Sequence, residues 1–407
     1  MAPIRVALIG LSASAKVNWA EQGHLPYLQS SRGKSHYEIV ALLNSSVQAA
    51  EAAREHYKLP TTVKTYGNPD DLAADPDVDL VVCNTRVDTH IGTTAPSLRK
   101  GKAVYIEWPL AENYDVAVDE LLGGRDEAHA RVDASTIGLQ GRVSPIALKL
   151  KEVLKSGRIG KVLSSDVRAF GNLGRRDSVS ESVAYFADRK VGGNHITIAF
   201  AHTIDYVHDV LGEFDLGSMK TRMQLQRPAL KIRDPTTGQN TDREVRSDVP
   251  DLLAVHGRLV AKEKGDRGIE IAEDATLSFT FRSGQQFKGQ PGFIWTINGE
   301  KGEIMVAASG AYIHSDSYKD PIEIKLHDHE TDQVVDVAWD WQEWQKKLPR
   351  RSRIVAELYE RFAHWWENGR PTGDLPDERE WPRLHDAVAR LKEFKELFRQ
   401  YDGQTQN

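Results

Sequence analysis

The first third of the chain alternates short apolar runs with segments of helical periodicity. The helix-like segments cover residues 47–57, 69–74, 91–99 and 114–130. The apolar runs have the length of buried strands and cover residues 4–9, 37–43, 79–84, 102–106 and 132–138. Strands that alternate with helices at this spacing are typical of βαβ units. We therefore expect an α/β domain with a mostly parallel sheet over residues 1–138.

The pattern changes after residue 138. A helix is predicted at 145–156, followed by runs in which apolar and polar residues alternate, at 162–170, 253–262, 276–282, 292–298 and 303–306. This alternation favours a mainly antiparallel sheet with one covered face, so we assign residues 139–402 to a second domain. The polar residues 227–248 predict a hairpin tip or a mobile loop. Amphipathic helices at 353–366 and 381–398 close the domain, and residues 403–407 are expected to be a frayed tail.

Composition excludes several classes of protein. The net charge of −6, from 53 basic and 59 acidic residues, argues against a globally basic nucleic-acid binder. The apolar runs are too short to span a bilayer, and a strand starting at residue 4 leaves no room for a signal peptide. The single cysteine, Cys83, excludes an intrachain disulfide and a thiolate zinc site. We therefore expect the cytoplasm, with the nucleus as the alternative if the basic run 346–353 is a targeting signal or a partner site.

The turn after the first apolar run is a candidate dinucleotide site. It has the place of a G-x-G-x-x-G/A turn, whose backbone N–H groups face a pyrophosphate, and its candidate cofactor contacts are Gly10, Leu11, Ser12, Ser14 and Ala15. Ser12 replaces the second glycine, so the fragment alone fits a plain strand-to-helix turn equally well. After the second strand the chain has Asn44 and no carboxylate. An amide binds a hydroxyl or a phosphate, so the cofactor is NAD or NADP.

Two later segments resemble the glucose–fructose oxidoreductase/inositol dehydrogenase (Gfo/Idh/MocA) family. Residues 78–90, VDLVVCNTRVDTH, are similar to its DxVxxxTPxxxH segment, and residues 101–111, GKAVYIEWPLA, to its GKHVxxEKPLA segment. The resemblance covers nearly the whole chain. It implies an N-terminal Rossmann NAD(P)-binding domain and a C-terminal domain with a large, mainly antiparallel, open-faced sheet. On the matching positions it implies cofactor contacts by Thr85, Arg86, His90, Glu107 and Trp108.

The catalytic positions depart from the family pattern. Trp108 stands where the family has the lysine of EKP. The ungapped match of residues 192–202 to GGGxxxDxGxH puts Ile198 at the aspartate and His202 at the histidine. Losing the lysine removes a proton relay, so His202 is the principal remaining acid/base candidate. Candidate substrate contacts are Gln140, Arg142 and Asn194.

A second histidine accompanies His202. His195, Ile198, His202 and Asp205 are spaced by 3, 4 and 3, so on one helix they share a face. In one interpretation both histidines are catalytic and Asp205 orients an imidazole. In the other the helix packs on the sheet and Asp205 caps it or bonds the backbone. An isolated histidine pair is poor evidence for a metal, and none is expected.

Two functions remain open. Glu107-Trp108 and residues 139–142, 202–205 and 249–253 resemble the branch of the family that contains the galactose-regulon repressor of yeasts. The first possible function is an NAD(P)-dependent oxidoreductase with a rearranged site, acting on a small polar or secondary-metabolite-type substrate. Alternatively it is a non-catalytic NAD(P)-sensing co-regulator that binds a protein partner. In both cases the open sheet face needs a cover, which predicts a homodimer.

Overall fold

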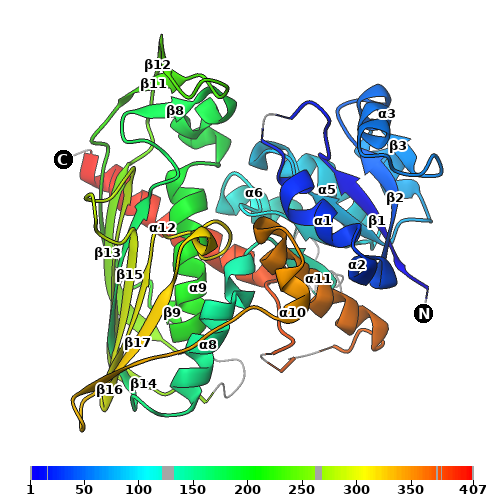
Figure 1. Ribbon diagram of the computed structural model, residues 1–407. Coiled ribbons are helices and arrows are strands. Elements are labelled where there is room, and N and C mark those ends of the chain that lie inside the picture. Colours follow the sequence, from blue (N-terminus) through cyan, green and yellow to red (C-terminus); the bar gives the residue numbers. More distant parts are fainter. Residues whose placement is uncertain are drawn as a thin grey trace. The chain divides into compact units, whose positions relative to one another are not determined.

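The computed structural model describes residues 2–15, 17–121, 133–261, 268–372, 375–376 and 378–405, and they form two compact units (Figure 1). Unit 1 comprises Met1–Gln140 and Gln342–Leu391, and unit 2 comprises Gly141–Trp341 and Lys392–Asn407. The sequence pattern placed residues 342–391 in the C-terminal domain. They belong to unit 1 instead, because their long helix, Arg350–Glu367, packs on the first helices of the chain, Ala20–His24 and Leu25–Leu28.

Unit 1 is built on a six-stranded parallel sheet in the order β3-β2-β1-β4-β5-β6, which is the order of a Rossmann fold. Its strands are β1 (Ile4–Ile9), β2 (Tyr37–Leu43), β3 (Lys64–Tyr66), β4 (Leu80–Cys83), β5 (Ala103–Ile106) and β6 (Ser135–Ile137). The predicted parallel sheet is thus confirmed. The hydrophobic pattern missed β3 because this edge strand is polar and only partly buried.

Helices cover the sheet on both faces, as right-handed crossovers require. They are η1 (Ala20–His24), α1 (Leu25–Leu28), α2 (Ser31–His36), α3 (Val47–His56), α4 (Pro69–Ala74), η2 (Val87–Thr89), α5 (His90–Arg99), α6 (Tyr114–Leu121), η3 (Gln140–Val143), α10 (Glu343–Lys346), α11 (Arg350–Glu367) and the first part of α12 (Leu384–Thr405). The side chain of Ser46 caps α3 and that of Asn68 caps α4. The predicted helix 114–130 is found as far as Leu121, and residues 122–130 lie outside the described part.

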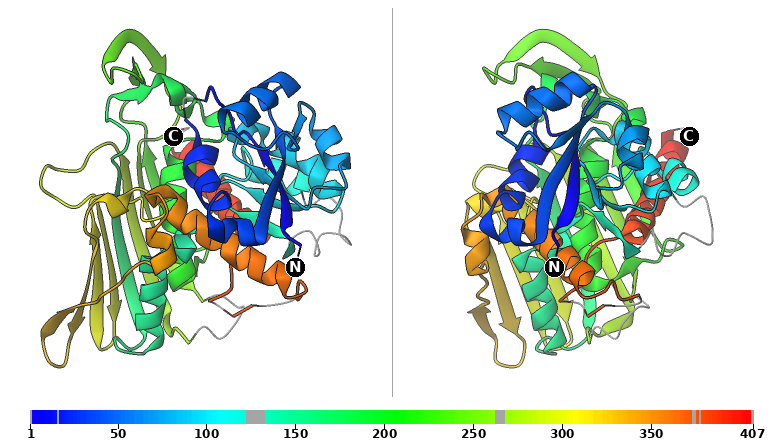
Figure 2. Two further views of the ribbon diagram at one scale, coloured as in Figure 1. Left: turned by 45° about the vertical axis from the view of Figure 1, so that its right-hand side comes forward. Right: turned by 90° about the vertical axis from the view of Figure 1, so that its right-hand side faces the viewer.

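Unit 2 contains a nine-stranded sheet that is mainly antiparallel, as predicted, with one parallel pair between β7 and β14. The strands of unit 2 are β7 (Val162–Gly171), β8 (Ser178–Ser180), β9 (Glu213–Phe214), β10 (Lys220–Gln224), β11 (Ala229–Arg233), β12 (Asn240–Arg246), β13 (Leu252–Val260), β14 (Ile271–Ser283), β15 (Phe293–Gly299), β16 (Gly302–Ala308), β17 (Glu323–Asp328) and β18 (Gln333–Asp336). Strands β8, β11 and β12 form a separate small sheet. The polar segment 227–248 is therefore a hairpin, the first of its two predicted forms (Figure 2).

Helices cover one face of the large sheet. The helices of unit 2 are α8 (Pro145–Lys155), η4 (Glu181–Ala187), η5 (Arg189–Val191), η6 (His195–Phe200), α9 (Ala201–Leu211), η7 (Ser317–Lys319) and the end of α12, and of these η4 packs on the small sheet. The ring of Phe200 meets Phe279 at 5.0 Å, and that of Tyr206 meets Trp295 at 6.1 Å. Figure 1 shows α9 lying along this face. None of the described helices has the length and apolar character needed to cross a bilayer.

The frayed tail predicted for residues 403–407 is wrong for its first residues, because α12 continues to Thr405. Side-chain hydrogen bonds to the edge strand β10 hold the last turns of this helix. Gln400 Oε1 accepts the N–H of Thr221 at 2.8 Å, and the Gln404 amide donates to the Thr221 carbonyl. Residues 406 and 407 lie outside the described part.

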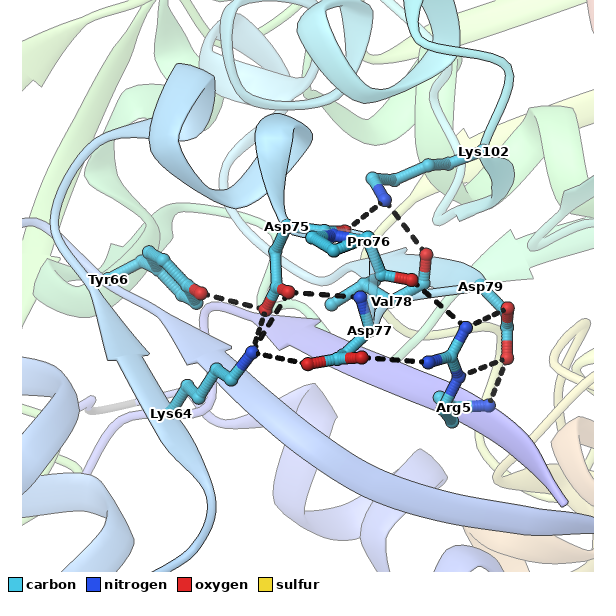
Figure 3. A network of polar contacts seen from close by, with 9 residues as sticks. All are labelled: Arg5, Lys64, Tyr66, Asp75, Pro76, Asp77, Val78, Asp79 and Lys102. Carbon is cyan, nitrogen blue, oxygen red and sulfur yellow. Dashed lines mark hydrogen bonds and ion pairs between the residues drawn. The ribbon is translucent and has the colours of Figure 1, made fainter.

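A polar network ties together the amino-terminal ends of the unit 1 strands (Figure 3). Asp75 is buried there and accepts hydrogen bonds from Lys64 Nζ at 2.9 Å, Tyr66 Oη at 2.7 Å and the Asp77 N–H at 3.0 Å. Arg5 binds both oxygens of Asp79 at 2.9 Å. Burial by itself raises the pKa of Asp75, but these hydrogen bonds outweigh it and lower the pKa below its usual value.

We expect Asp75→Asn to destabilise the chain by about 1–3 kcal/mol at pH 7, as the charged acceptor is lost. A carboxyl whose pKa is lowered by folding stabilises above its unfolded pKa, and this contribution is lost as the pH falls through the folded value. The difference in the free energy of unfolding between parent and variant should therefore become smaller below about pH 3.9. Chemical unfolding against pH measures it, with Asp77→Asn as the control, because the Asp77 side chain is 59% exposed. An equal loss in both variants would contradict the assignment.

Candidate functional site

The carboxyl ends of β1 and β4 meet at Gly10, which has a φ of +87°. A Cβ at this position would lie 2.8 Å from Thr85 Cγ2 and 3.2 Å from the Asn84 carbonyl. Only glycine fits both the conformation and the space. In open parallel sheets ligands bind at this edge of the strands, so the geometry keeps the backbone of the first turn close to a site there.

The turn after Gly10 differs from a standard dinucleotide turn. No helix follows it directly, since residues 11–15, 17 and 18 are not helical and η1 begins at Ala20. Ser12 Oγ accepts the N–H of Ser14 at 3.2 Å, and Ser14 and Ala15 are exposed. The Asn44 amide donates to the Leu11 carbonyl at 3.0 Å, so this predicted ribose contact also holds the turn. A pyrophosphate would meet exposed serines and backbone here instead of a helix N-terminus.

Asn84, at the end of β4, is a polar residue that the sequence analysis did not select. Both atoms of its side-chain amide are buried, and among the described residues neither has a hydrogen-bond partner. A buried amide without partners costs free energy unless a ligand or water satisfies it. The donor and acceptor suit the hydroxyl, amide and phosphate groups of a dinucleotide, so the residues at this edge fit the cofactor that the sequence implies. The signal in the sequence was a polar residue directly after a buried strand.

His90 and Arg86 make internal contacts. The His90 ring is 2% exposed, with Nδ1 2.9 Å from the Pro109 carbonyl and Nε2 2.9 Å from the Thr85 carbonyl. Burial lowers its pKa although both carbonyls raise it, and the ring lies between the loop after β4 and the loop after β5. Arg86 Nε binds Asp88 at 2.6 Å on the surface. In this geometry His90 shapes the site and Arg86 is held by its neighbour.

The loop after β5 carries Glu107 and Trp108, both buried. Glu107 Oε1 lies 3.0 Å from His24 Nε2, and His24 Nδ1 lies 2.9 Å from Tyr359 Oη on α11. A Cβ at Gly138 would lie 2.5 Å from Glu107 Oε2, so the carboxylate packs directly on the end of β6. The indole of Trp108 is 5% exposed and precedes a cis bond to Pro109. Glu107 is thus fixed by a buried chain of polar groups.

The histidine segment of unit 2 begins as a π-helix and continues as an α-helix. Asn194 caps η6, as its Oδ1 accepts the N–H groups of Ile196 and Thr197 at 2.9 and 3.1 Å. Its Nδ2 is buried with no hydrogen-bond partner in the described chain, which leaves a donor for a ligand. The wider π turn breaks the regular spacing, so His195 and His202 do not share one α-helical face. The sequence pattern did not predict this turn, which often marks functional sites.

His202 stacks on a histidine that the sequence analysis missed. Its ring lies 4.0 Å from that of His314, with an angle of 11° between the planes, and both side chains are buried. Burial, and next the charge of His202, lower the pKa of His314 well below its usual range. Burial lowers the pKa of His195 to about 4. His314 and His195 are therefore neutral at pH 7, and His202 stays the acid/base candidate that its motif position predicts.

Asp205 pairs with an arginine, a partner that neither interpretation of the sequence named. Its two oxygens bind Arg142 Nε at 2.8 Å and Nη2 at 2.6 Å, in a buried bidentate pair. Asp209, one turn further on α9, pairs with Lys151 of α8. Arg142, a predicted substrate contact, is thus held within unit 2. The neighbouring Gln140 is buried, and its Oε1 has no hydrogen-bond partner among the residues described.

Comparisons with known proteins agree with this geometry. Residues 4–127 match an oxidoreductase family with an NAD-binding Rossmann fold, and residues 145–308 match the C-terminal domain of Gal80p. The dehydrogenase aclE of Aspergillus oryzae is 32% identical over 314 residues, which are 77% of this chain and 79% of that protein. The galactose/lactose metabolism regulatory protein GAL80 of Kluyveromyces lactis is 24% identical over 76% of this chain, and the match spans 65% of that protein.

Solved structures show the same fold. A super-repressor mutant of Gal80p from Saccharomyces cerevisiae has a TM-score of 0.80 at 21% identity, covering 98% of this chain and 96% of that one. Levoglucosan dehydrogenase in complex with NADH and levoglucosan has a TM-score of 0.71 at 14% identity, covering 99% and 98%. The matched domains, the dehydrogenase relative and the shared fold place this chain in the Gfo/Idh/MocA oxidoreductase family, with a C-terminal domain of the Gal80p type.

Proposed function

We propose that the protein is an NAD(P)-dependent oxidoreductase that acts on a small polar or secondary-metabolite-type substrate. The observation that carries the proposal is the buried pair of His202 and His314. The stacking at 4.0 Å on a second ring holds the imidazole of His202 in one orientation. This arrangement suits a group that takes and returns one proton. A dehydrogenase among the relatives supports the same proposal.

In this proposal the residues of the chain divide the work. The nicotinamide, when bound, supplies the oxidising or reducing equivalent. Gly10, Ser12, Asn44 and Asn84 hold the dinucleotide through backbone and side-chain polar groups. His202 takes the proton that leaves a substrate hydroxyl, and it donates that proton when a carbonyl is reduced. Asn194 and Gln140 orient the substrate through their remaining donor and acceptor. Trp108, in unit 1, takes the position where the family pattern has lysine.

The second candidate function is a non-catalytic NAD(P)-sensing co-regulator that binds a protein partner. It is favoured by the match of residues 145–308 to Gal80p and by the replacement of the family's lysine and aspartate by Trp108 and Ile198. Both functions need the dinucleotide, so cofactor binding does not separate them. Turnover that depends on His202 separates them, because only the oxidoreductase requires it.

The cofactor site can be tested at Asn84. We expect Asn84→Leu to weaken the binding of NAD(H) or NADP(H) about tenfold, because one or two hydrogen bonds of about 1 kcal/mol each are lost. Leucine is close to asparagine in size, and the substitution removes the two buried amide atoms that have no partner within the described part of the chain. Calorimetry on the full chain measures the affinity, and Arg399→Leu, which removes an exposed ion pair with Glu396 on α12, is the control. No binding to the parent at millimolar concentration would overturn the site.

We also propose a homodimer through the open face of the nine-stranded sheet, in the cytoplasm. In the described part of unit 2 the helices lie on the other face (Figure 2). The open face carries polar residues together with the exposed Leu163 and Met305, which a second copy would cover. Sedimentation at micromolar concentration should give twice the chain mass of 45.6 kDa. The chain mass itself would contradict the dimer.

A further inference from the structure

Three elements of unit 2 bring a histidine and two glutamates together, away from His202. His208 lies near the end of α9, Glu213 begins β9, and Glu393 lies on α12. One ligand atom from each of the three residues lies within 4.8 Å of the other two. His208 and Glu393 are buried and Glu213 is half-buried. His208 and Glu213 lie close together in the sequence, but Glu393 comes from the last helix of the chain, so no local motif contains all three residues.

The hydrogen-bond partners of His208 indicate which of its two ring nitrogens is available to a ligand. Its Nδ1 lies 2.7 Å from the Gly212 carbonyl, which only accepts, so Nδ1 carries a proton and donates it. In a neutral ring Nε2 then carries a lone pair. Within the described part of the chain this fully buried Nε2 makes no hydrogen bond, and it faces Glu393 Oε2 at 3.4 Å. A lone pair that faces a carboxylate needs a cation between them, or a proton on the ring or on the carboxyl.

The distance favours the cation. A charge-assisted hydrogen bond from an imidazolium to a carboxylate is about 2.7–2.9 Å long. The ligands of a tetrahedral zinc ion, with bonds of about 2.0–2.2 Å, lie about 3.4 Å apart. The Nδ1–H bond to a backbone carbonyl is also the usual support of a histidine that ligates through Nε2. The T-shaped contact of the ring with Phe214, at 4.8 Å, fixes its orientation.

The backbone conformation at Gly212 places the start of β9 beside the end of α9. Gly212 has a φ of +98°, and a Cβ there would lie 2.4 Å from the Val260 carbonyl, so only glycine lets the chain turn sharply from α9 into β9. Glu213 pairs with Val260 in the sheet, which fixes the start of β9 beside the end of α9. The geometry points to a divalent cation site of the zinc type, with His208 Nε2, Glu213 and Glu393 as ligands. The sequence analysis expected no metal. The ion would join α9, β9 and α12.

The test is zinc binding by the full chain after dialysis against a chelator. We expect one Zn²⁺ per chain by elemental analysis and calorimetry, and a higher midpoint of thermal unfolding when Zn²⁺ is restored. His208→Gln should lower the zinc affinity at least about 100-fold and abolish that shift. Glu213→Gln keeps both buried residues, so it should fold and still weaken binding.

His385→Gln is the matched control. His385 lies on α12 with Nε2 3.4 Å from Asp386, but its side chain is 51% exposed and lacks a third ligand. The control should bind zinc as the parent does. Absence of stoichiometric zinc from the parent, or equal binding by parent and His208→Gln, would overturn the site and leave His208 and Glu393 as a buried polar pair. Neither result depends on turnover, so it does not bear on the proposed oxidoreductase.

Discussion

His202→Ala should lower turnover about 10²–10⁴-fold, the range for the loss of a general acid or base, and leave the affinity for the dinucleotide nearly unchanged. His314 cannot take over, because its pKa lies well below its usual range, and His195, with a pKa of about 4, is neutral at pH 7. His202 belongs to unit 2, whereas Gly10 and Asn84 belong to unit 1. The rate and the affinity should therefore respond separately.

Steady-state kinetics and calorimetry on the same preparations measure both quantities. His327→Ala is the control, because that histidine lies on β17 and pairs with Asp332 at 2.8 Å on the surface. His314→Phe keeps an aromatic ring against His202 and should lose far less activity than His202→Ala. A His202→Ala variant that turns over as fast as the parent would make His202 a packed helix residue.

The second large effect concerns stability. We expect Arg142→Met to lower the free energy of unfolding by about 3–5 kcal/mol, because it leaves the Asp205 carboxylate, 1% exposed, without its bidentate partner. Unfolding by urea measures the loss. The double variant Arg142→Met with Asp205→Leu should recover much of it, since both charges are then absent.

The same variant tests the predicted role of Arg142 in substrate binding. If Arg142→Met folded as stably as the parent and raised KM, Arg142 would be a substrate contact and the ion pair would contribute little. A loss of stability that the double variant restores, with unchanged KM, assigns Arg142 to positioning of α9.

Local sequence signals predicted the parallel sheet well, because β4 and β5 are continuous buried apolar runs and β1 and β2 are apolar except for one charged residue each. Polar edge strands such as β3 carry no such signal. The pattern also could not assign residues 342–391 to the first unit, since that depends on how α11 packs and not on its own periodicity.

The candidate site was predicted in part. Gly10 and His202 followed from motif positions, and the structure keeps Gly10 in a conformation that requires glycine. His314 and Asn84 were missed, because a single polar residue in a loop or at a strand end has no periodic signature. The partner of Asp205 was missed for a different reason: Arg142 lies 63 residues away in the sequence, and only packing brings the two together.

The oxidoreductase proposal is tested most directly by following the absorbance of the nicotinamide with the parent and His202→Ala over a library of small polyols, diols, hydroxy acids and their carbonyl counterparts. The account predicts that at least one pair of compounds is turned over by the parent and at least about 10²-fold more slowly by the variant. Equal turnover by both proteins would contradict the role of His202. Tight dinucleotide binding without turnover of any compound would contradict the enzyme and favour the co-regulator.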